Sequence, residues 1–215
     1  MRSAYNLNID SDSLRTDLNY IDNMWNDVSQ EYKDKMDCKV FDENVYYVSK
    51  KVVKDLKLNG LLNMFSLFED AFLDHFKIMQ MMPGELYGYH IDNNKHSIHS
   101  EIPQHMTCPA AVNILLSEPV GDTTYFGIDE KLNKYKSWGE KHLPRNDTQE
   151  FKIVDRFETK KDAVLLNIGN WHRIESNHNQ PRKLASFLLW PYNTWENYVR
   201  YCKLKGLINE QEKLT

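Results

Sequence analysis

The second part of the chain is a series of short strand-like segments, and this pattern limits the possible folds more than any other feature. The segments are rich in β-branched, aromatic and aliphatic residues, and clusters of Pro, Gly, Asn and Asp separate them. We expect strands at 76–82, 86–92, 110–116, 123–126, 152–157, 163–167, 171–175 and 184–190. Short strands separated by such clusters predict a sandwich, barrel or jelly roll and not a series of βαβ units.

The first third of the chain is expected to be helical. Apolar residues recur there at intervals of three and four, at Leu14, Leu18, Ile21, Trp25, Val28 and Tyr32. A coiled-coil seam is the alternative, but the stripe is too short for one, which favours packing against the chain's own sheet. A second helix is predicted at 50–58 with Gly60 as its stop signal, a third at 61–73, and a last one at 194–207.

These elements predict one domain over residues 1–215, mainly β with flanking α-helices. Residues 1–74 would form a helical support, 75–191 a jelly-roll core and 192–215 a C-terminal helix. The polar stretch 131–150 has few strand signals and is interpreted as an exposed loop. With 41% hydrophobic and 12% aromatic residues, the chain can supply one substantial core.

The net charge and the cysteine content limit which binding partners and which cellular compartment are expected. A net charge of -4 gives no electrostatic footprint for nucleic acid or for an anionic membrane. The three cysteines are far apart, without a CxxC pair, which favours a reducing compartment. The N-terminus lacks the apolar stretch of a signal peptide, and no run approaches the ~18 apolar residues of a membrane span. We therefore expect a cytoplasmic protein.

A histidine and an aspartate two positions apart form the first half of a candidate metal site. His90 and Asp92 end a predicted strand, where residues two apart project from the same face. A second imidazole from a distant strand would complete two histidines and one carboxylate. That set leaves coordination positions open and suits ferrous iron in oxygen-activating enzymes.

Two histidines compete for the third ligand position. His172 lies beside Trp171 and Ile174, which indicate a partly buried strand, whereas His178 lies in a turn-like segment. A strand holds a ligand more rigidly than the tip of a turn, so His172 is favoured.

Arg182 is the further element of the candidate site. It precedes an apolar strand ten residues after His172, where an unpaired guanidinium would be strongly unfavourable. Its partner is either an internal Asp or Glu or the carboxylate of a ligand, which an arginine grips in bidentate fashion. Ser186 would face the same side and add a hydroxyl donor.

These motifs together resemble the prolyl-4-hydroxylase-type members of the 2-oxoglutarate/iron(II) dioxygenase superfamily. In that family a glycine and a tyrosine precede the metal histidine, as Gly84 and Tyr87 precede His90. Residues 111–117 and 121–126 resemble the family's next hairpin, and residues 160–167 with His172 resemble the later strand and distal histidine. Gln80 stands where many members carry a tyrosine.

The resemblance implies a double-stranded β-helix, also called a jelly roll or cupin-like fold, with Fe(II), 2-oxoglutarate and O2 at its site. The implied metal ligands are His90, Asp92 and His172, and Arg182 matches the residue that binds the distal carboxylate of the cosubstrate. The further implied contacts to this small-molecule cosubstrate are Ser186, Tyr87, Asn113 and Tyr125.

The implied reaction hydroxylates a substrate with release of succinate and CO2. Protein side chains and small metabolites are both compatible substrates, and neither a membrane nor nucleic acid is expected as a partner. Two alternatives stay open: a non-catalytic jelly-roll binding or structural module, and a cupin-like metalloenzyme that does not use 2-oxoglutarate. Arg182 discriminates against the latter, which gives the arginine no carboxylate to hold.

Overall fold

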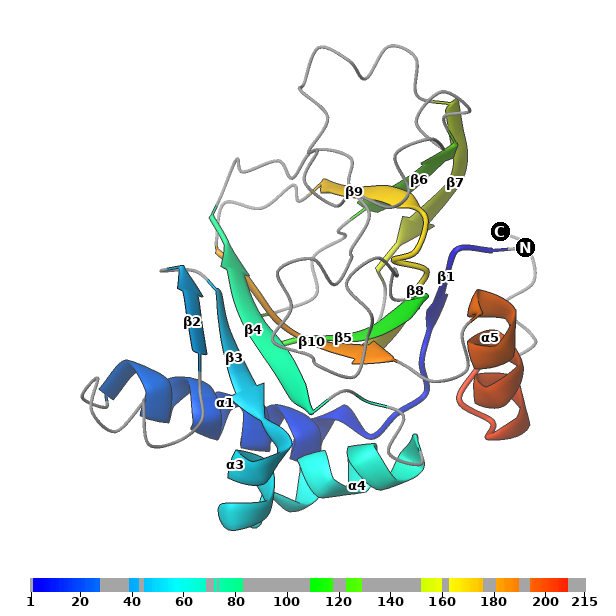
Figure 1. Cartoon of the computed structure of the whole chain (residues 1–215). Coiled ribbons are helices and arrows are strands. Elements are labelled where there is room, and N and C mark those ends of the chain that lie inside the picture. The colour runs from blue at the N-terminus through cyan, green and yellow to red at the C-terminus, as the bar shows by residue number, and fades with distance from the viewer. Residues whose placement is uncertain are drawn as a thin grey trace.

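The protein folds around two antiparallel β-sheets that face each other (Figure 1). The computed structural model describes residues 2–27, 39–42, 45–68, 72, 74–82, 109–117, 123–128, 152–159, 163–175, 181–189 and 194–208. The predicted strand at 86–92 and the predicted loop at 131–150 lie outside these ranges. Within them, no helix is long and apolar enough to cross a membrane.

The larger sheet has seven strands, and every pair of neighbours is antiparallel. Its strands, in spatial order, are β1 (Ala4–Asn6), β8 (Ala163–Leu166), β5 (Ala110–Leu115), β10 (Arg182–Leu189), β4 (His75–Met81), β3 (Val45–Ser49) and β2 (Lys39–Asp42). The smaller sheet has three strands, in the order β7 (Lys152–Glu158), β6 (Thr123–Ile128) and β9 (Trp171–Glu175).

The path of the chain between the two sheets defines the fold class. From β5 onward the chain enters the smaller sheet for β6 and β7, returns for β8, crosses again for β9 and returns for β10. This winding is that of a double-stranded β-helix, so the predicted jelly-roll fold with flanking helices is confirmed.

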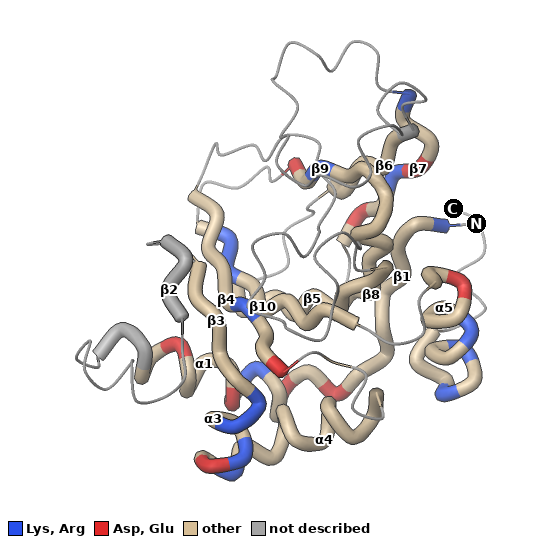
Figure 2. The backbone as a smooth tube through the Cα atoms, in the orientation of Figure 1, with Lys and Arg blue, Asp and Glu red and all other residues tan. Residues whose placement is uncertain are grey.

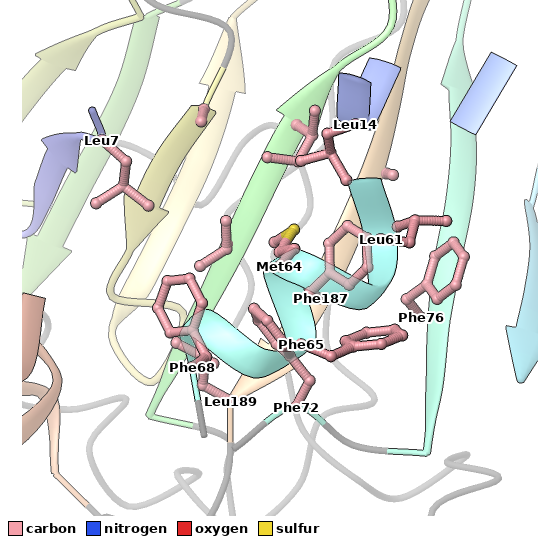
Figure 3. Close-up of a cluster of buried hydrophobic side chains, with 14 of the residues drawn as sticks. Leu7, Leu14, Leu61, Met64, Phe65, Phe68, Phe72, Phe76, Phe187 and Leu189 are labelled. Atoms are coloured by element: carbon pink, nitrogen blue, oxygen red, sulfur yellow. The ribbon is translucent and has the colours of Figure 1, made fainter. Parts of the chain in front are cut away.

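Helices cover one side of the larger sheet, and the smaller sheet lies on the other side (Figure 1). The helices are α1 (Ser11–Asp27), α3 (Lys50–Asp55), α4 (Asn59–Leu67) and α5 (Trp195–Leu204). The helix-side core contains a group of aromatic rings from α4, β4 and β10 (Figure 3). Phe76 and Phe187 stack there with ring centroids 4.6 Å apart, which joins the β4–β10 pair to the helical layer.

Strands β5, β8 and β10 of the larger sheet are buried on both faces, which explains their nearly continuous apolar sequences. Along β10, Ala185 and Phe187 point into the helix-side core, whereas Leu188 packs against a second core between the sheets. That second core also holds Ala111 of the larger sheet and Phe126 of the smaller one. We call the face of each sheet that is turned toward the other sheet its inner face.

The apolar stripe of the first helix packs on the chain itself, as predicted. Leu14, Leu18 and Ile21 of α1 are fully buried in the helix-side core, in which α4 also takes part. The far end of the stripe, Val28 and Tyr32, lies outside the described residues.

The prediction of an all-helical first third was wrong, because β1, β2 and β3 extend the larger sheet there. Val45–Ser49 (VYYVS) is itself a β-branched and aromatic run, a strand signal that the helical periodicity around it obscured. Strand β3 is stabilised by pairing with β4.

The prediction that Gly60 stops a helix was also wrong. Helix α3 ends earlier, and Lys57 takes the left-handed conformation there with φ of 54°. The amides of Lys57 and Leu58 donate to the carbonyls of Lys54 and Val53, which is the hydrogen-bond pattern of a Schellman motif. Gly60 lies inside α4, where a Cβ would come within 2.6 Å of the carbonyl oxygen of Ser13. The absence of a side chain at Gly60 allows α1 and α4 to pack closely.

Candidate metal and cosubstrate site

His172 lies on the inner face of the smaller sheet. It is only 3% exposed and stands directly opposite Phe126 across the β6–β9 pair. Directly opposite residues of an antiparallel pair share a face, and the two rings lie 6.1 Å apart. Because Phe126 belongs to the core between the sheets, the His172 imidazole also faces the larger sheet.

The hydrogen bond of His172 fixes which ring nitrogen suits a metal. Nδ1 lies 2.9 Å from the carbonyl oxygen of Asn170, and a carbonyl can only accept, so Nδ1 carries the proton. In the neutral imidazole the lone pair is then on Nε2. Metal-binding histidines are oriented in the same way, with the second ring nitrogen donating to a carbonyl or carboxylate. The donor chemistry of His172 therefore fits a divalent metal.

Arg182 is the first residue of β10 and is 5% exposed. Side chains alternate along a strand, and Ala185 and Phe187 point to the helices, so Arg182, Leu184 and Ser186 take the inner face. The start of β10 is basic (Figure 2). Nη1 of Arg182 donates to Sδ of Met81 at 3.6 Å, across the last described pair of the β4–β10 ladder. A guanidinium is thus held between the two sheets.

Ser186 and Asn113 form a polar pair farther along the same inner face. They are opposite each other in the β10–β5 ladder and are 3% and 9% exposed. The Asn113 Oδ1 atom is buried and has no hydrogen-bond partner among the described residues. An unsatisfied buried amide costs about 1–3 kcal/mol, so the pair is better suited to a ligand than to an empty core.

Tyr125 lies apart from this site, contrary to what the resemblance implies. It directly precedes Phe126 on β6, so its side chain points to the outer face of the smaller sheet. There its ring lies between two guanidinium groups, with Arg173 at 5.0 Å and Arg156 at 5.8 Å from the centroid. The structure does not bring Tyr125 together with His172, because the two side chains point to opposite faces.

Gln80 does not face the candidate site either. It stands opposite Lys183 on the helix side of the larger sheet, so the inner-face positions of β4 nearest Arg182 belong to Met79 and Met81. The sequence patterns had not singled out these methionines, since their role depends on the strand register. Met81 contacts the arginine directly, and Met79 is the next inner-face residue of β4.

The remaining predicted site residues, His90, Asp92 and Tyr87, lie outside the described residues, as does the rival ligand His178. The described part of the chain contains no group of three His, Cys, Asp or Glu side chains able to hold a metal by itself. The structure thus places His172, Arg182, Ser186 and Asn113 on the two inner faces.

Comparison with known proteins supports the fold. No protein-family model and no curated protein matches the chain. Among solved structures, the chain is similar to the non-haem alpha-ketoglutarate-dependent carbocyclase SnoK from nogalamycin biosynthesis, with a TM-score of 0.53 and 13% identity. The match covers 87% of this chain and 79% of SnoK. EctD from S. alaskensis gives a TM-score of 0.48 at 14% identity, covering 91% of this chain and 75% of EctD. At such identity the likeness to SnoK establishes the jelly-roll fold alone.

Proposed function

We propose that the protein is a 2-oxoglutarate- and Fe(II)-dependent oxygenase. The observation that carries the proposal is the pair of buried polar side chains on facing sheets: His172 on the smaller sheet and Arg182 on the larger one. The first offers a nitrogen lone pair for a metal and the second a cation for a carboxylate. A cosubstrate that binds a metal at one end and carries a carboxylate at the other matches both.

In the proposed site, His90 and Asp92 join His172 to hold Fe(II) with two imidazoles and one carboxylate. The metal and 2-oxoglutarate supply the oxidation of the substrate by O2, with release of succinate and CO2. The chain contributes the orientation of the His172 ring, through its hydrogen bond to Asn170 and the buried Phe126 ring beside it.

Arg182 is proposed to hold the distal carboxylate of 2-oxoglutarate, with Ser186 and Asn113 as further hydrogen-bonding groups. A buried guanidinium binds a carboxylate with two parallel hydrogen bonds, which fixes the cosubstrate's orientation as well as its affinity. Tyr87 stays in the proposal as a further contact, whereas Tyr125 is left out because of its place on the outer face.

The finer proposal is a prolyl-4-hydroxylase-like hydroxylase made of one domain and acting in the cytoplasm. Its substrate would be a protein side chain or a small metabolite. The sequence motifs around Gly84, His90 and Arg182 support this subtype.

Anaerobic addition of Fe(II) and 2-oxoglutarate tests the proposal. The wild-type protein is expected to develop the weak visible charge-transfer band of the metal-bound cosubstrate. The Arg182→Ala variant should need at least tenfold more 2-oxoglutarate for the same band, since a buried charged partner is lost. The matched control is Arg173→Ala, which removes an arginine from the outer face, where it pairs with Glu175.

Each outcome decides between the candidate functions. A band in the wild type and in Arg173→Ala, weakened in Arg182→Ala, supports the proposal. Metal binding without a 2-oxoglutarate-dependent band would identify a cupin-like metalloenzyme of another kind. No metal binding at all would leave a non-catalytic jelly-roll module and would overturn the proposal.

A further inference from the structure

A buried carboxylate on α1 bridges two strands of the larger sheet. Asp22 is 7% exposed and receives a hydrogen bond from the Tyr46 hydroxyl at 2.8 Å on Oδ1. Its other oxygen, Oδ2, lies 2.6 Å from Nζ of Lys183. One carboxylate thus binds a phenol of β3 and an ammonium of β10 at the same time.

The two partners of Asp22 lie on either side of β4. Tyr46 is opposite Ile78 in the β3–β4 pair, and Lys183 is opposite Gln80 in the β4–β10 pair. Asp22 therefore spans the helix side of β4 near the end from which the chain continues toward His90. Met81 and Arg182 form the adjacent pair of the same two strands, and their side chains lie on the inner face.

The backbone of Lys183 is also held. Its amide donates to Oγ of Ser117 at 3.3 Å, and its carbonyl accepts from the amides of Leu116 and Ser117 at 2.9 and 3.3 Å. With the ion pair to Asp22, Lys183 is fixed by its main chain and its side chain. The strand end at which β10 begins would otherwise be the part most prone to fray.

We propose that Asp22 and Lys183 are positioning residues that aim Arg182 into the cosubstrate site. Neighbouring side chains of a strand point to opposite faces, so holding the Lys183 side chain toward α1 directs the Arg182 guanidinium to the inner face. Tyr46 completes the arrangement by fixing the carboxylate. The inference rests on the proposed function, because it assigns the network a role in binding 2-oxoglutarate.

The alternative is an ion pair that only docks α1 on the sheet. Such a pair would lower the melting temperature when broken but would leave the affinity of the folded protein for 2-oxoglutarate unchanged. A positioning role changes that affinity at temperatures where every variant is fully folded. Affinity and stability measured together therefore separate the two roles.

The test is the dissociation constant of 2-oxoglutarate for the Mn(II)-loaded protein, measured by calorimetry well below each variant's melting temperature. Asp22→Asn keeps the size of the side chain and an acceptor for Tyr46 but removes the charge that holds Lys183. It is expected to weaken 2-oxoglutarate binding about tenfold, the usual scale for losing a group that orients a ligand-binding residue. Lys183→Met should weaken it by a similar factor, and the double variant no further, because both act through one contact.

Milder and control variants accompany this measurement. Lys183→Arg keeps the charge and is expected to retain wild-type affinity within about twofold. Tyr46→Phe removes only one hydroxyl, so this variant is expected to fold even if Asp22→Asn fails to fold. Tyr46→Phe is expected to weaken binding about threefold, less than loss of the charge. Asp55→Asn is the matched control, since it breaks the exposed ion pair of Lys51 and Asp55 on α3.

The results distinguish failure of this inference from failure of the proposed function. If wild type binds 2-oxoglutarate and Arg182→Ala does not, but Asp22→Asn, Lys183→Met and Tyr46→Phe bind as wild type does, the positioning role is wrong and the proposed function stands. If wild type itself does not bind, both are wrong. Weakened binding in these variants, with normal binding in Lys183→Arg and Asp55→Asn, supports the positioning role.

Discussion

Individual polar side chains on the inner faces are the strongest indication that the space between the sheets binds a ligand. Asn113 stands in the middle of an otherwise fully buried strand, between Val112 and Ile114, yet its Oδ1 has no described hydrogen-bond partner. A residue selected only for stability at this place would be aliphatic. A buried amide that is unsatisfied in the free protein is typical of a position where stability is given up for ligand binding.

Replacing Asn113 tests this trade-off. Asn113→Val removes the unsatisfied amide and places a β-branched side chain beside Ser186 and Val164. The free energy of unfolding is expected to stay constant or to rise by up to about 2 kcal/mol, because the desolvation cost disappears. The affinity for 2-oxoglutarate should fall about tenfold. Urea unfolding measures the change in stability, and calorimetry measures the change in affinity. Ser66→Val on α4 is a control outside the inner faces. A large loss of stability in Asn113→Val would show that the amide is structural.

The sequence predicted some of these residues and missed others for a physical reason. The burial of His172 and Arg182 was predictable, because apolar neighbours at alternate positions indicate a buried strand. The exclusion of Tyr125 was not, since Tyr125 and Phe126 are adjacent aromatic residues and either one could face the core. Only the pairing of β6 with β9 settles which of the two shares a face with His172.

At the scale of elements, the order of strands was predictable, while the extent of the sheet was not. The strands β4 to β10 are short runs, either alternating or continuously apolar, with flanking turn residues, and these features identify strands locally. Strand β1 is short and pairs with the distant β8, which no local pattern encodes, whereas the local strand signal of β3 was obscured by the helical periodicity around it. The end of α3 was misplaced for a similar reason, because a lysine occupies the left-handed position in which glycine is usual.

Two substitutions near that helix end should have opposite effects on stability. Lys57→Gly relieves the left-handed strain of an L-residue at φ of 54° and is expected to stabilise the protein by up to about 1 kcal/mol. Gly60→Ala forces a methyl group against the backbone of Ser13 and is expected to destabilise it by about 1–3 kcal/mol. Thermal and urea unfolding measure both; stabilisation by Gly60→Ala would contradict the close approach of α1 and α4.

At the scale of the whole molecule, the site depends on how the two sheets are held together. Among the residues that the structure describes, the core between the sheets is smaller than the core under the helices. It is supplemented by a hydrogen bond from the Ser3 amide, beside the edge strand β1 of the larger sheet, to Oδ2 of Asp155 on β7, at 2.6 Å. Most of the described apolar core lies on the helix side of the larger sheet (Figure 3), whereas the inner faces also carry polar side chains such as Asn113 and Ser186.

Removing the hydrogen bond between Ser3 and Asp155 tests whether it helps to hold the two sheets together. Asp155→Ala is expected to cost about 1–3 kcal/mol of unfolding free energy, because a charge-assisted hydrogen bond is lost. Asp155→Asn keeps an acceptor oxygen for the Ser3 amide and should cost less. Equal losses for the two variants, measured by urea unfolding, would show that the Ser3 contact contributes nothing.

The most direct test of the central claim is the binding of Mn(II), in place of Fe(II), measured from the loss of the free-ion signal in electron paramagnetic resonance. One site per chain is expected in the wild type. His172→Ala should bind at least a hundredfold more weakly, since one of three protein ligands is lost, while His178→Ala should bind as the wild type does. Equal binding by wild type and His172→Ala, or loss of binding in His178→Ala alone, would contradict the proposed site.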